Sequence, residues 1–348
     1  MDKIRTNIRK DCLASASEHG DIISMLSNEK ISITGGTGFL GSWIAEMIIV
    51  LNTEFDANIV LDIFARDINT WQKKYPHFSS FEYINCISHD IRSPITFSSD
   101  TSFIIHAAGS PSSRVHASDP LGAVKTILGV ENALQASAKL SNLKRFVNIS
   151  SCFVVGKNNK NDVGTKESDC FPIKPGALDS AYCEAKRTAE TLCSIYRSSF
   201  RLPISTIRPF TFTGPYQSLQ NPWAINNFMN DIINGNDIRI HSDGRAKRSY
   251  LYGSDVAFWV LTSLVKGIDG GIYNLGGSRP ITHNNLANLL REISPNMVNL
   301  RHNTLFTGDR QNDNLYPDMN HTMVSLGVKE SCSTEQSITK TLHWFLNK

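Results

Sequence analysis

A series of glycines follows a short β-prone segment near the start of the sequence. Residues 31–34 alternate isoleucine with small hydroxylated side chains, and Gly35, Gly38 and Gly41 follow at three-residue spacing. Glycine lets the backbone turn sharply and approach a pyrophosphate, and a helix that begins there offers free N–H groups. A strand, this turn and the apolar helical pattern over residues 43–51 predict a dinucleotide-binding turn. The motif constrains the fold strongly, because it is typical of parallel α/β sheets.

A tyrosine and a lysine form the second informative feature. Tyr182 and Lys186 are four residues apart in a helical pattern, so they share one helix face. We expect the ammonium to favour the phenolate and to lower the pKa of the phenol from ~10 toward neutrality. Such a tyrosine can donate a proton to a carbonyl oxygen or accept one from an alcohol.

Apolar, β-prone runs alternate with helical patterns over much of the chain. The predicted strands are residues 31–34, 58–65, 81–87, 102–107, 145–150 and 204–208. Further helical patterns lie at residues 21–26, 222–234 and 281–293. The alternation predicts an α/β fold with a Rossmann-like, doubly wound parallel sheet and a smaller C-terminal α/β domain that binds the substrate.

The character of the sequence changes at several points, which define the expected domains. Residues 1–28 form an N-terminal extension, and residues 29–208 form the cofactor-binding domain. Residues 248–266 are expected to return to that domain, whereas residues 209–247 and 267–348 form the substrate-binding domain.

Composition excludes several classes of function. A net charge of +3 over 348 residues, without a Lys/Arg run, argues against nucleic-acid binding. No apolar stretch approaches the ~18–20 residues of a membrane span, and the first residues lack a secretory leader pattern. The 7 cysteines contain no Cys-x-x-Cys and the 10 histidines lack zinc-ligand spacing. We therefore expect a cytoplasmic protein with reduced thiols, without a metal and without a membrane partner.

From about residue 29 to its end, the chain resembles the extended short-chain dehydrogenase/reductase family. Within that family it resembles the nucleotide-sugar-modifying, NAD-dependent epimerase/dehydratase-like branch. The glycine turn and the Tyr-x-x-x-Lys pair carry the resemblance. Further family-like segments follow in order at residues 90–91, 104–109, 146–156, 208–215 and 243–252.

The resemblance implies a nicotinamide cofactor and assigns residues to it. These residues are Thr34, Gly35, Thr37, Gly38, Phe39, Leu40, Gly41, Asp90, Ile91, Ala107, Ala108, Gly109, Tyr182, Lys186 and Pro209. The second predicted strand ends at Arg66 and Asp67. Arg66 favours NADP(H) over NAD(H), because a guanidinium pairs well with a 2′-phosphate. Asp67 is the competing candidate, because an acidic residue at this position hydrogen-bonds an unphosphorylated ribose.

The resemblance also identifies Ser151 as the catalytic serine, with Tyr182 as general acid/base and Lys186 as the residue that tunes it. It implies a substrate-binding set of Ser151, Cys152, Thr211, Asn227 and Arg248. Family members commonly have asparagine where this chain has Thr211, so the pose of the substrate is left open.

The residues after Ser151 bear on the type of reaction. Family 4,6-dehydratases have Asp-Glu there, and decarboxylases of UDP-glucuronate usually keep the glutamate. This chain has Cys152 and Phe153, and phenylalanine cannot transfer a proton. Dehydration or decarboxylation would need another carboxylate, such as Glu184. Cys152 could instead transfer a proton in a 3- or 5-epimerase, or be an ordinary buried thiol.

These features lead to a ranked set of functions. We expect an NAD(P)-dependent enzyme that reduces a nucleotide-linked 4-keto-6-deoxyhexose, with Tyr182 as the proton donor. The alternatives are a C4 epimerase with tightly bound NAD and a non-catalytic nucleotide-sensing protein. Family members are often dimers through a four-helix contact, so helices near residues 121–139 and 182–199 are expected to form a homodimer.

Overall fold

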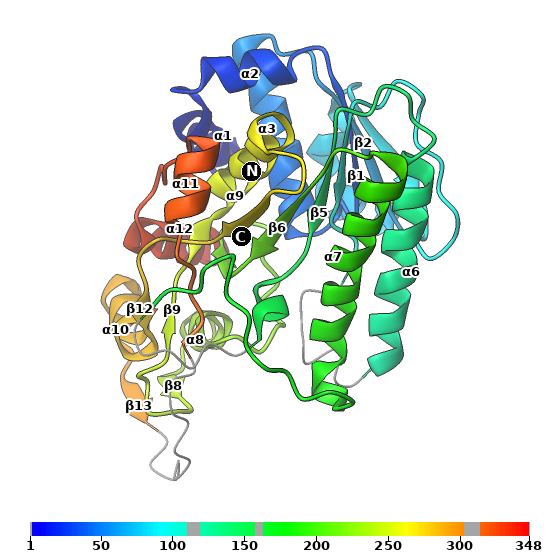
Figure 1. Ribbon diagram of the computed structural model, residues 1–348. Coiled ribbons are helices and arrows are strands. Elements are labelled where there is room, and N and C mark those ends of the chain that lie inside the picture. The colour runs from blue at the N-terminus through cyan, green and yellow to red at the C-terminus, as the bar shows by residue number, and fades with distance from the viewer. Residues whose placement is uncertain (1, 110–118, 157–162, 303–313, 348) are drawn as a thin grey trace.

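Seven parallel strands form the central sheet of the structure, a computed structural model that describes residues 2–109, 119–156, 163–302 and 314–347 (Figure 1). Their order is β11-β6-β5-β4-β1-β2-β3. The strands are β1 Lys30–Thr34, β2 Val60–Ala65, β3 Ile84–Ser88, β4 Phe103–His106, β5 Arg145–Ile149, β6 Ile204–Pro209 and β11 Ile272–Leu275. The α/β fold class and the six predicted strands are confirmed. The seventh strand was not predicted, because it is short and lies between glycine pairs at 270–271 and 276–277.

Helices cover both faces of the sheet. The helices of the described residues are α1 Asp2–Ala16, α2 Gly20–Leu26, α3 Phe39–Phe55, α4 Ile68–Lys74, α6 Pro120–Ser137, α7 Ala181–Phe200, α8 Ala224–Ile233, α9 Gly253–Lys266, α10 His283–Ile293, α11 Asn320–Leu326 and α12 Thr334–Leu346. On one face α3 packs on α9, and on the other α6 packs on α7, which form the right-hand layer in Figure 1. Among the residues that the structure describes, no helix has the length and apolar character needed to cross a bilayer.

The alternation of side chains along each strand produces two separate cores. Ile105 and Val147 point into the core formed with α3 and α9. Their neighbours Ile104 and Phe146 point into the core formed with α6 and α7. This is the two-residue period of a strand buried on both faces.

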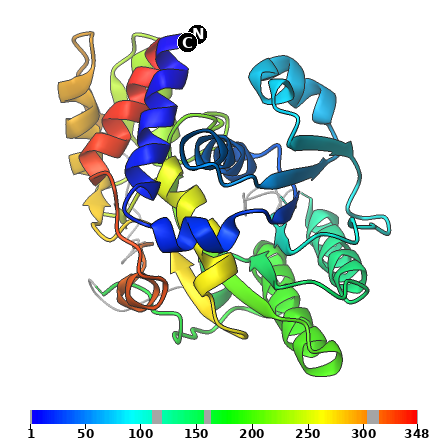
Figure 2. The same ribbon diagram turned by 90° about the horizontal axis from the view of Figure 1, so that it is seen from above.

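The N-terminal helix α1 is part of the first core. Ile8, Cys12 and Ala16, spaced by four residues, are at most 3% exposed and pack with α3 and α9. The Ser15 hydroxyl donates to Asp255 on α9 at 2.7 Å, and Lys340 of α12 donates to Asp11 at 2.5 Å. Figure 2 shows α1 and α12 side by side. Helix α1 was not predicted, because its polar residues outnumber this narrow apolar stripe.

The C-terminal elements have a core of their own. α8, α10 and α12 pack together with β8 (Ile238–Ile240) around residues such as Phe228, Leu286 and Ile338. Three pairs of short strands complete this region: β7 (Phe212–Thr213) with β10 (Leu251–Tyr252), β9 (Lys247–Arg248) with β12 (Ile281–Thr282), and β8 with β13 (Leu300–His302). The domain boundaries expected from the sequence stay a prediction.

The third glycine of the turn fixes how closely α3 approaches β1. A Cβ atom on Gly41 would lie 2.1 Å from the backbone oxygen of Gly36. Since backbone cannot rotate away as a side chain can, the start of α3 would have to shift. By contrast, a Cβ on Gly20, the first residue of α2, meets nothing within 4 Å.

We expect Gly41→Ala to lower the free energy of unfolding by roughly 1–3 kcal/mol through overpacking. Gly20→Ala, the matched control, should change it by no more than about 0.5 kcal/mol. Urea unfolding followed by circular dichroism measures both. Equal stability of the two variants would show that the turn tolerates a side chain at Gly41.

Candidate active site

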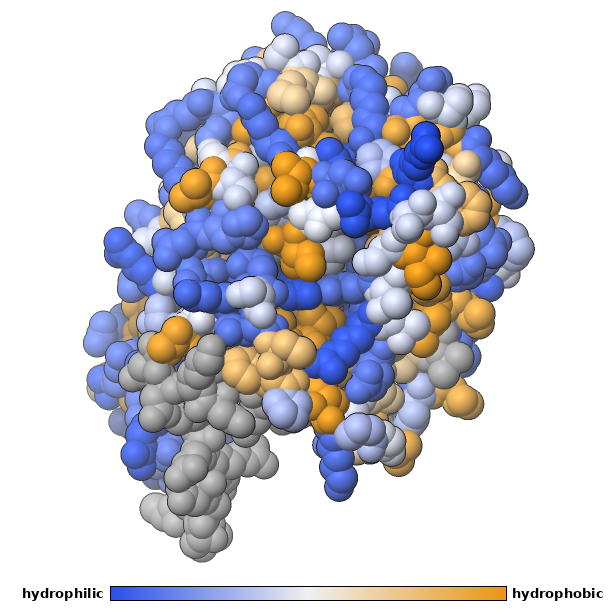
Figure 3. Space-filling model, viewed as in Figure 1, coloured by the Kyte–Doolittle hydropathy of each residue, from blue (hydrophilic) through white to orange (hydrophobic). Residues whose placement is uncertain are grey.

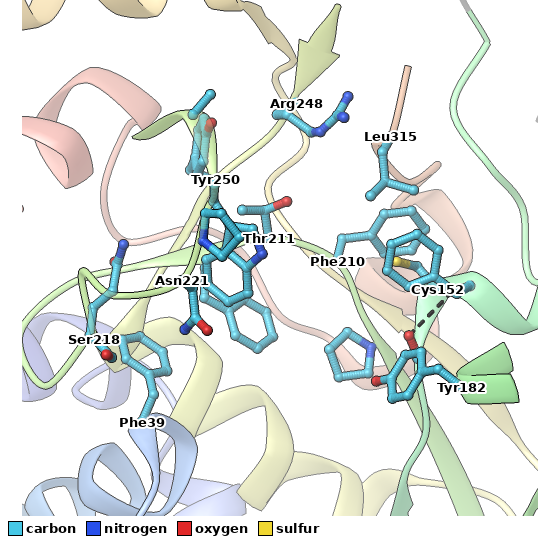
Figure 4. A pocket seen from close by; sticks show the side chains of 18 of the residues that line it. Phe39, Cys152, Tyr182, Phe210, Thr211, Ser218, Asn221, Arg248, Tyr250 and Leu315 are labelled. Atoms are coloured by element: carbon cyan, nitrogen blue, oxygen red, sulfur yellow. Dashed lines mark hydrogen bonds between the residues drawn. The ribbon is translucent and has the colours of Figure 1, made fainter. Parts of the chain in front are cut away.

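A cavity of about 1680 Å³ opens at the carboxyl ends of the strands, between the sheet and the C-terminal elements. Small-molecule sites in proteins usually occupy roughly 300–1,000 Å³, so this one has room for two ligands. The predicted site residues that line it are Gly35, Thr37, Gly38, Phe39, Leu40, Ala107, Gly109, Ser151, Cys152, Tyr182, Lys186, Pro209, Thr211, Asn227 and Arg248. Figure 4 shows Cys152 and Tyr182 on one side of it and Phe39, Ser218 and Asn221 on the other.

Six predicted cofactor residues do not line the cavity: Thr34, Gly41, Arg66, Asp90, Ile91 and Ala108. Thr34 is buried and hydrogen-bonds His106 Nδ1 at 2.9 Å, and Gly41 serves helix packing. Asp90 forms an ion pair with Arg92, whose guanidinium lowers the pKa of that carboxyl to about 2. The backbone oxygen of Ile91 accepts a hydrogen bond from Asn132. The contacts of these residues with the cofactor stay predictions.

The glycine turn is shaped to hold a phosphate-bearing ligand. Gly35 has a φ of +73°, and a Cβ there would lie 2.8 Å from the carbonyl oxygen of Ala107. Gly38 precedes α3, and no side chain caps the N–H groups of the first turn of that helix. A 17-residue helix with free N–H groups at its start favours an anion there. The turn therefore fits the pyrophosphate of a dinucleotide.

Ser151 and Tyr182 meet on the cavity wall. Ser151 is the second residue after β5 and is 5% exposed, and its hydroxyl oxygen accepts a hydrogen bond from the backbone N–H of Phe153 at 3.3 Å. Tyr182, 5% exposed, lies in the first turn of α7 and is hydrogen-bonded to Ser151. The ring of Phe153 lies edge-on to that of Tyr182, with centroids 6.2 Å apart. The structure thus brings the predicted serine and tyrosine together.

Burial changes the proton affinities of the predicted catalytic pair. Burial raises the pKa of Tyr182 to about 12, and the hydrogen bond with Ser151 offsets only part of this rise. The expectation that Lys186 draws this pKa toward neutrality is not met, because desolvation of the phenolate outweighs the neighbouring charge. Tyr182 is therefore a neutral phenol at cellular pH, which suits a proton donor.

Lys186 is buried one helical turn beyond Tyr182 on α7, and its charge is only partly compensated. Its Nζ donates to the carbonyl oxygen of Ile149 at 2.8 Å. Burial lowers the pKa of its ammonium to about 8, while the Glu190 carboxylate acts in the opposite direction. A lysine that titrates this close to neutral pH is typical of functional sites.

Cys152 lies in the same wall of the cavity, and its own thiol is protonated at neutral pH. Burial raises its pKa to about 12, although Ser151 and the charge of Arg248 lower it in part. A thiol with this proton affinity is a poor base at neutral pH. Glu184, the substitute carboxylate, is exposed and does not line the cavity. Neither residue therefore supports an additional acid/base step.

Other residues of the wall were not predicted. Phe210 and Leu315 lie next to Cys152 in Figure 4, and Tyr250 lies on the far side. Leu315 reaches the site because its N–H donates to the carbonyl oxygen of Lys247 at 3.0 Å. No sequence signal marks Leu315, since this contact joins segments nearly 70 positions apart. Phe210 follows a predicted strand end, and its position could have been inferred.

The end of β2 presents both charged candidates for recognition of the adenosine ribose. Arg66 and Asp67 are exposed, and only Asp67 lines the cavity. The Asp67 carboxylate accepts a hydrogen bond from the backbone N–H of Thr70 at 3.1 Å and so caps α4. Lys74, at the other end of α4, also lines the cavity. The preference for NADP(H) stays a prediction.

Comparison with protein families gives a match over most of the sheet and the site. The model described as "NAD dependent epimerase/dehydratase family" matches residues 31–276. UDP-glucuronic acid decarboxylase 1 of Arabidopsis thaliana is 30% identical over 266 residues, which cover 76% of this chain and 58% of that protein. Its counterpart in Xenopus tropicalis is 23% identical, over 93% of this chain and 73% of that protein. The chain spans about 60% of the length of the Arabidopsis decarboxylases 1 and 2.

Solved structures share the fold at lower identity. UDP-N-acetylglucosamine 4-epimerase from Methanobrevibacter ruminantium M1 has a TM-score of 0.78 at 21% identity, covering 92% of this chain and 99% of that chain. A mutant of UDP-glucuronic acid 4-epimerase from Bacillus cereus, in complex with UDP-4-deoxy-4-fluoro-glucuronic acid and NAD, has a TM-score of 0.76 at 22% identity, covering 91% of this chain and 99% of that chain. At this identity the likeness establishes the fold alone.

The charge of Lys186 should change within the physiological pH range. Since its pKa is lowered to about 8, we expect the ammonium to predominate below that pH and the neutral amine above it. The ε-carbon resonance of ¹³C-labelled lysine, assigned by Lys186→Arg, measures this titration. A midpoint near the value of ~10.4 for an exposed lysine would contradict the assigned burial.

Proposed function

Because the chain belongs to the NAD dependent epimerase/dehydratase family, we propose that it is an NAD(P)-dependent enzyme that reduces a nucleotide-linked 4-keto-6-deoxyhexose. The observation that carries this proposal is a neutral Tyr182 phenol, hydrogen-bonded to Ser151, on the wall of a cavity large enough for cofactor and substrate. Ketone reduction needs a proton donor of this kind and no further carboxylate.

Each residue of the site has a defined part in this reaction. When bound, a nicotinamide cofactor supplies the hydride, and the glycine turn would hold its pyrophosphate. Tyr182 donates the proton to the former carbonyl oxygen, and the Ser151 hydroxyl holds that oxygen as negative charge develops. Lys186, one helical turn beyond Tyr182 on α7, provides a positive charge that stabilises the phenolate left after the transfer. Arg248 is the candidate partner of the substrate diphosphate.

The apolar character of the wall near Tyr182 supports a deoxygenated sugar. Phe153, Phe210 and Leu315 line the cavity close to Cys152 and offer no hydrogen-bonding side-chain group. A methyl group at C6 would pack against them, whereas a carboxylate or hydroxymethyl group would lose hydration without a partner. Phenylalanine at position 153 also removes the carboxylate route to dehydration.

A C4 epimerase is the second candidate. With a bound nicotinamide as the hydride acceptor, Tyr182 could equally take the proton of the sugar alcohol, and the hydride and proton would then return with the hydride on the opposite face. The large cavity gives a keto intermediate space to rotate. In that direction Tyr182 must first act as a base, and its raised pKa makes this step costly. For this reason we rank the reductase first.

We also propose that the protein forms a homodimer through α6 and α7. Leu121, Leu128 and Ile195 on these helices are 49–68% exposed, and Phe200 at the end of α7 is 57% exposed. In Figure 3, apolar residues interrupt the polar surface over the layer that holds these helices. Pairing of two such layers would remove this apolar surface from water.

A panel of nucleotide-linked 4-keto-6-deoxyhexoses and their parent nucleotide-sugars tests the proposed reaction. We expect stoichiometric oxidation of NADPH with a keto-sugar and a product alcohol identified by NMR. In the same assay Tyr182→Phe should lower kcat by roughly 10²–10⁴-fold, since it removes the proton donor. Binding of NADPH should remain close to that of the wild type.

Tyr196→Phe is the matched control, because Tyr196 lies on the same helix and its hydroxyl donates to Glu131 outside the cavity. It should turn over like the wild type. Conversion of a parent nucleotide-sugar to its C4 epimer without net NADPH use would favour the epimerase. Full activity of Tyr182→Phe would remove the tyrosine from its assigned part.

For the cofactor we propose NADP(H). Arg66 is exposed at the strand end and available to a 2′-phosphate, while Asp67 is engaged as a helix cap. Lys74 adds a second positive charge on the same side of the cavity. These charges favour the cofactor with the extra phosphate.

Substitutions at the two candidates separate the cofactors. We expect Arg66→Ala to lower kcat/KM for NADPH by roughly 10- to 100-fold, the cost of one charged hydrogen bond, and to leave kcat/KM for NADH unchanged. Asp67→Asn, the control at the adjacent position, should not reduce the preference for NADPH. The reverse pattern would identify Asp67 as the ribose partner and NAD(H) as the cofactor.

A further inference from the structure

Side chains of α7 hydrogen-bond to the backbone of the segment that carries Ser151. Lys186 donates to the carbonyl oxygen of Ile149 at 2.8 Å, and Arg187 Nε donates to that of Val154 at 2.6 Å. These contacts hold residues 149–154 against the helix that carries Tyr182. The alignment of Ser151 with Tyr182 therefore depends on this side of α7.

Glu190 adds a charged contact to the same junction. Its Oε1 accepts hydrogen bonds from the Ser150 hydroxyl at 2.6 Å and from Arg208 Nε at 2.9 Å. Its Oε2 accepts a hydrogen bond from the second arm of the Arg208 guanidinium at 2.7 Å. Arg208 also donates to the carbonyl oxygen of Glu167 at 2.7 Å. The side chains of Arg208 and Glu190 are only 9% and 17% exposed, so the carboxylate is fixed in place.

The position of Glu190 relates this junction to Lys186. Glu190 lies one helical turn beyond Lys186 on α7, and its negative charge counteracts the effect of burial on the ammonium. Cys193 and His106 also interact with Lys186. Burial raises the pKa of Cys193 to about 12 and lowers that of His106 to about 3, so both stay neutral. Among these described neighbours, the negative charge comes from Glu190.

We propose that Glu190, held by Arg208 and Ser150, is a positioning residue that keeps Lys186 charged and Ser151 aligned with Tyr182. Neither Glu190 nor Arg208 lines the cavity, so both act through the residues that do. The expected effect of Glu190 on turnover rests on the proposed function. Its effect on the charge of Lys186 can be measured without any substrate.

Glu190→Gln tests the proposal, because it keeps the shape of the side chain and removes its charge. We expect the ε-carbon titration of Lys186 to move down by roughly one pH unit, the effect of one lost charge at partly buried distance. The alkaline limb of the pH profile of kcat should move down with it. Arg208→Gln, which frees Glu190 of its counter-ion, should move the titration of Lys186 up.

Asp269→Asn is the matched control. Asp269 accepts a bidentate pair of hydrogen bonds from Arg197, also on α7, at 2.8 and 3.0 Å, but it lies at the exposed end of the helix. Its loss should leave the Lys186 titration and the pH profile unchanged. Glu190→Asp, which retains the charge, should restore most of the wild-type titration.

The outcomes separate this inference from the proposed function. An unchanged titration of Lys186 in Glu190→Gln would overturn the inference. If Glu190→Gln does not fold, an unchanged titration of Lys186 in Arg208→Gln would overturn it instead. Such a result would leave Glu190 as a structural ion pair, even if thermal stability falls. A shifted titration together with a fully active Tyr182→Phe would instead retain the inference and remove the proposed function.

Discussion

Parallel backbone pairing of β1, β4, β5 and β6 is the constraint on which the site depends. Register between these strands places the glycine turn, Ala107, Ser151 and Pro209 at one edge of the sheet. These residues are far apart in sequence, and strand pairing brings them together without direct contacts between their side chains. The order of strands reverses direction between β1 and β4, which opens the crevice that such sheets use for ligands.

Burial acts in opposite directions on the two titratable groups of this crevice. It disfavours the anionic form of Tyr182 and the cationic form of Lys186, so each moves toward its neutral state. The result is a phenol that keeps its proton and a lysine close to half-charged in mildly alkaline conditions. The charge on Lys186 then depends on neighbours such as Glu190. A site of this kind is sensitive to residues that never touch a ligand.

The parts of the molecule with local sequence signals could be predicted. The six strands, the glycine turn and the Tyr182–Lys186 pair follow from periodicity or short spacing, whereas Ser151 was identified through the family resemblance. The structure places the side chains of Ser151, Tyr182 and Lys186 in the lining of one cavity. The resemblance assigned Asp90 and Ile91 to the cofactor. In the structure Asp90 pairs with Arg92 and the Ile91 carbonyl accepts a hydrogen bond from Asn132, and their contact with the cofactor stays a prediction, because a strand-end motif does not reveal which way a loop turns. Leu315 could not be foreseen at all, since only tertiary packing brings it to the cavity.

The contact between α1 and α12 has a consequence for how the chain assembles. Asp11 is paired with Lys340, and Ser15 with Asp255, so α1 finds its charged and polar partners 329 and 240 positions further along the sequence. Until those residues have emerged, Asp11 lacks its counter-ion and the apolar stripe of α1 lacks part of its cover. These contacts of α1 with α9 and α12 can therefore form only late in folding, and until then the exposed apolar stripe of α1 favours aggregation.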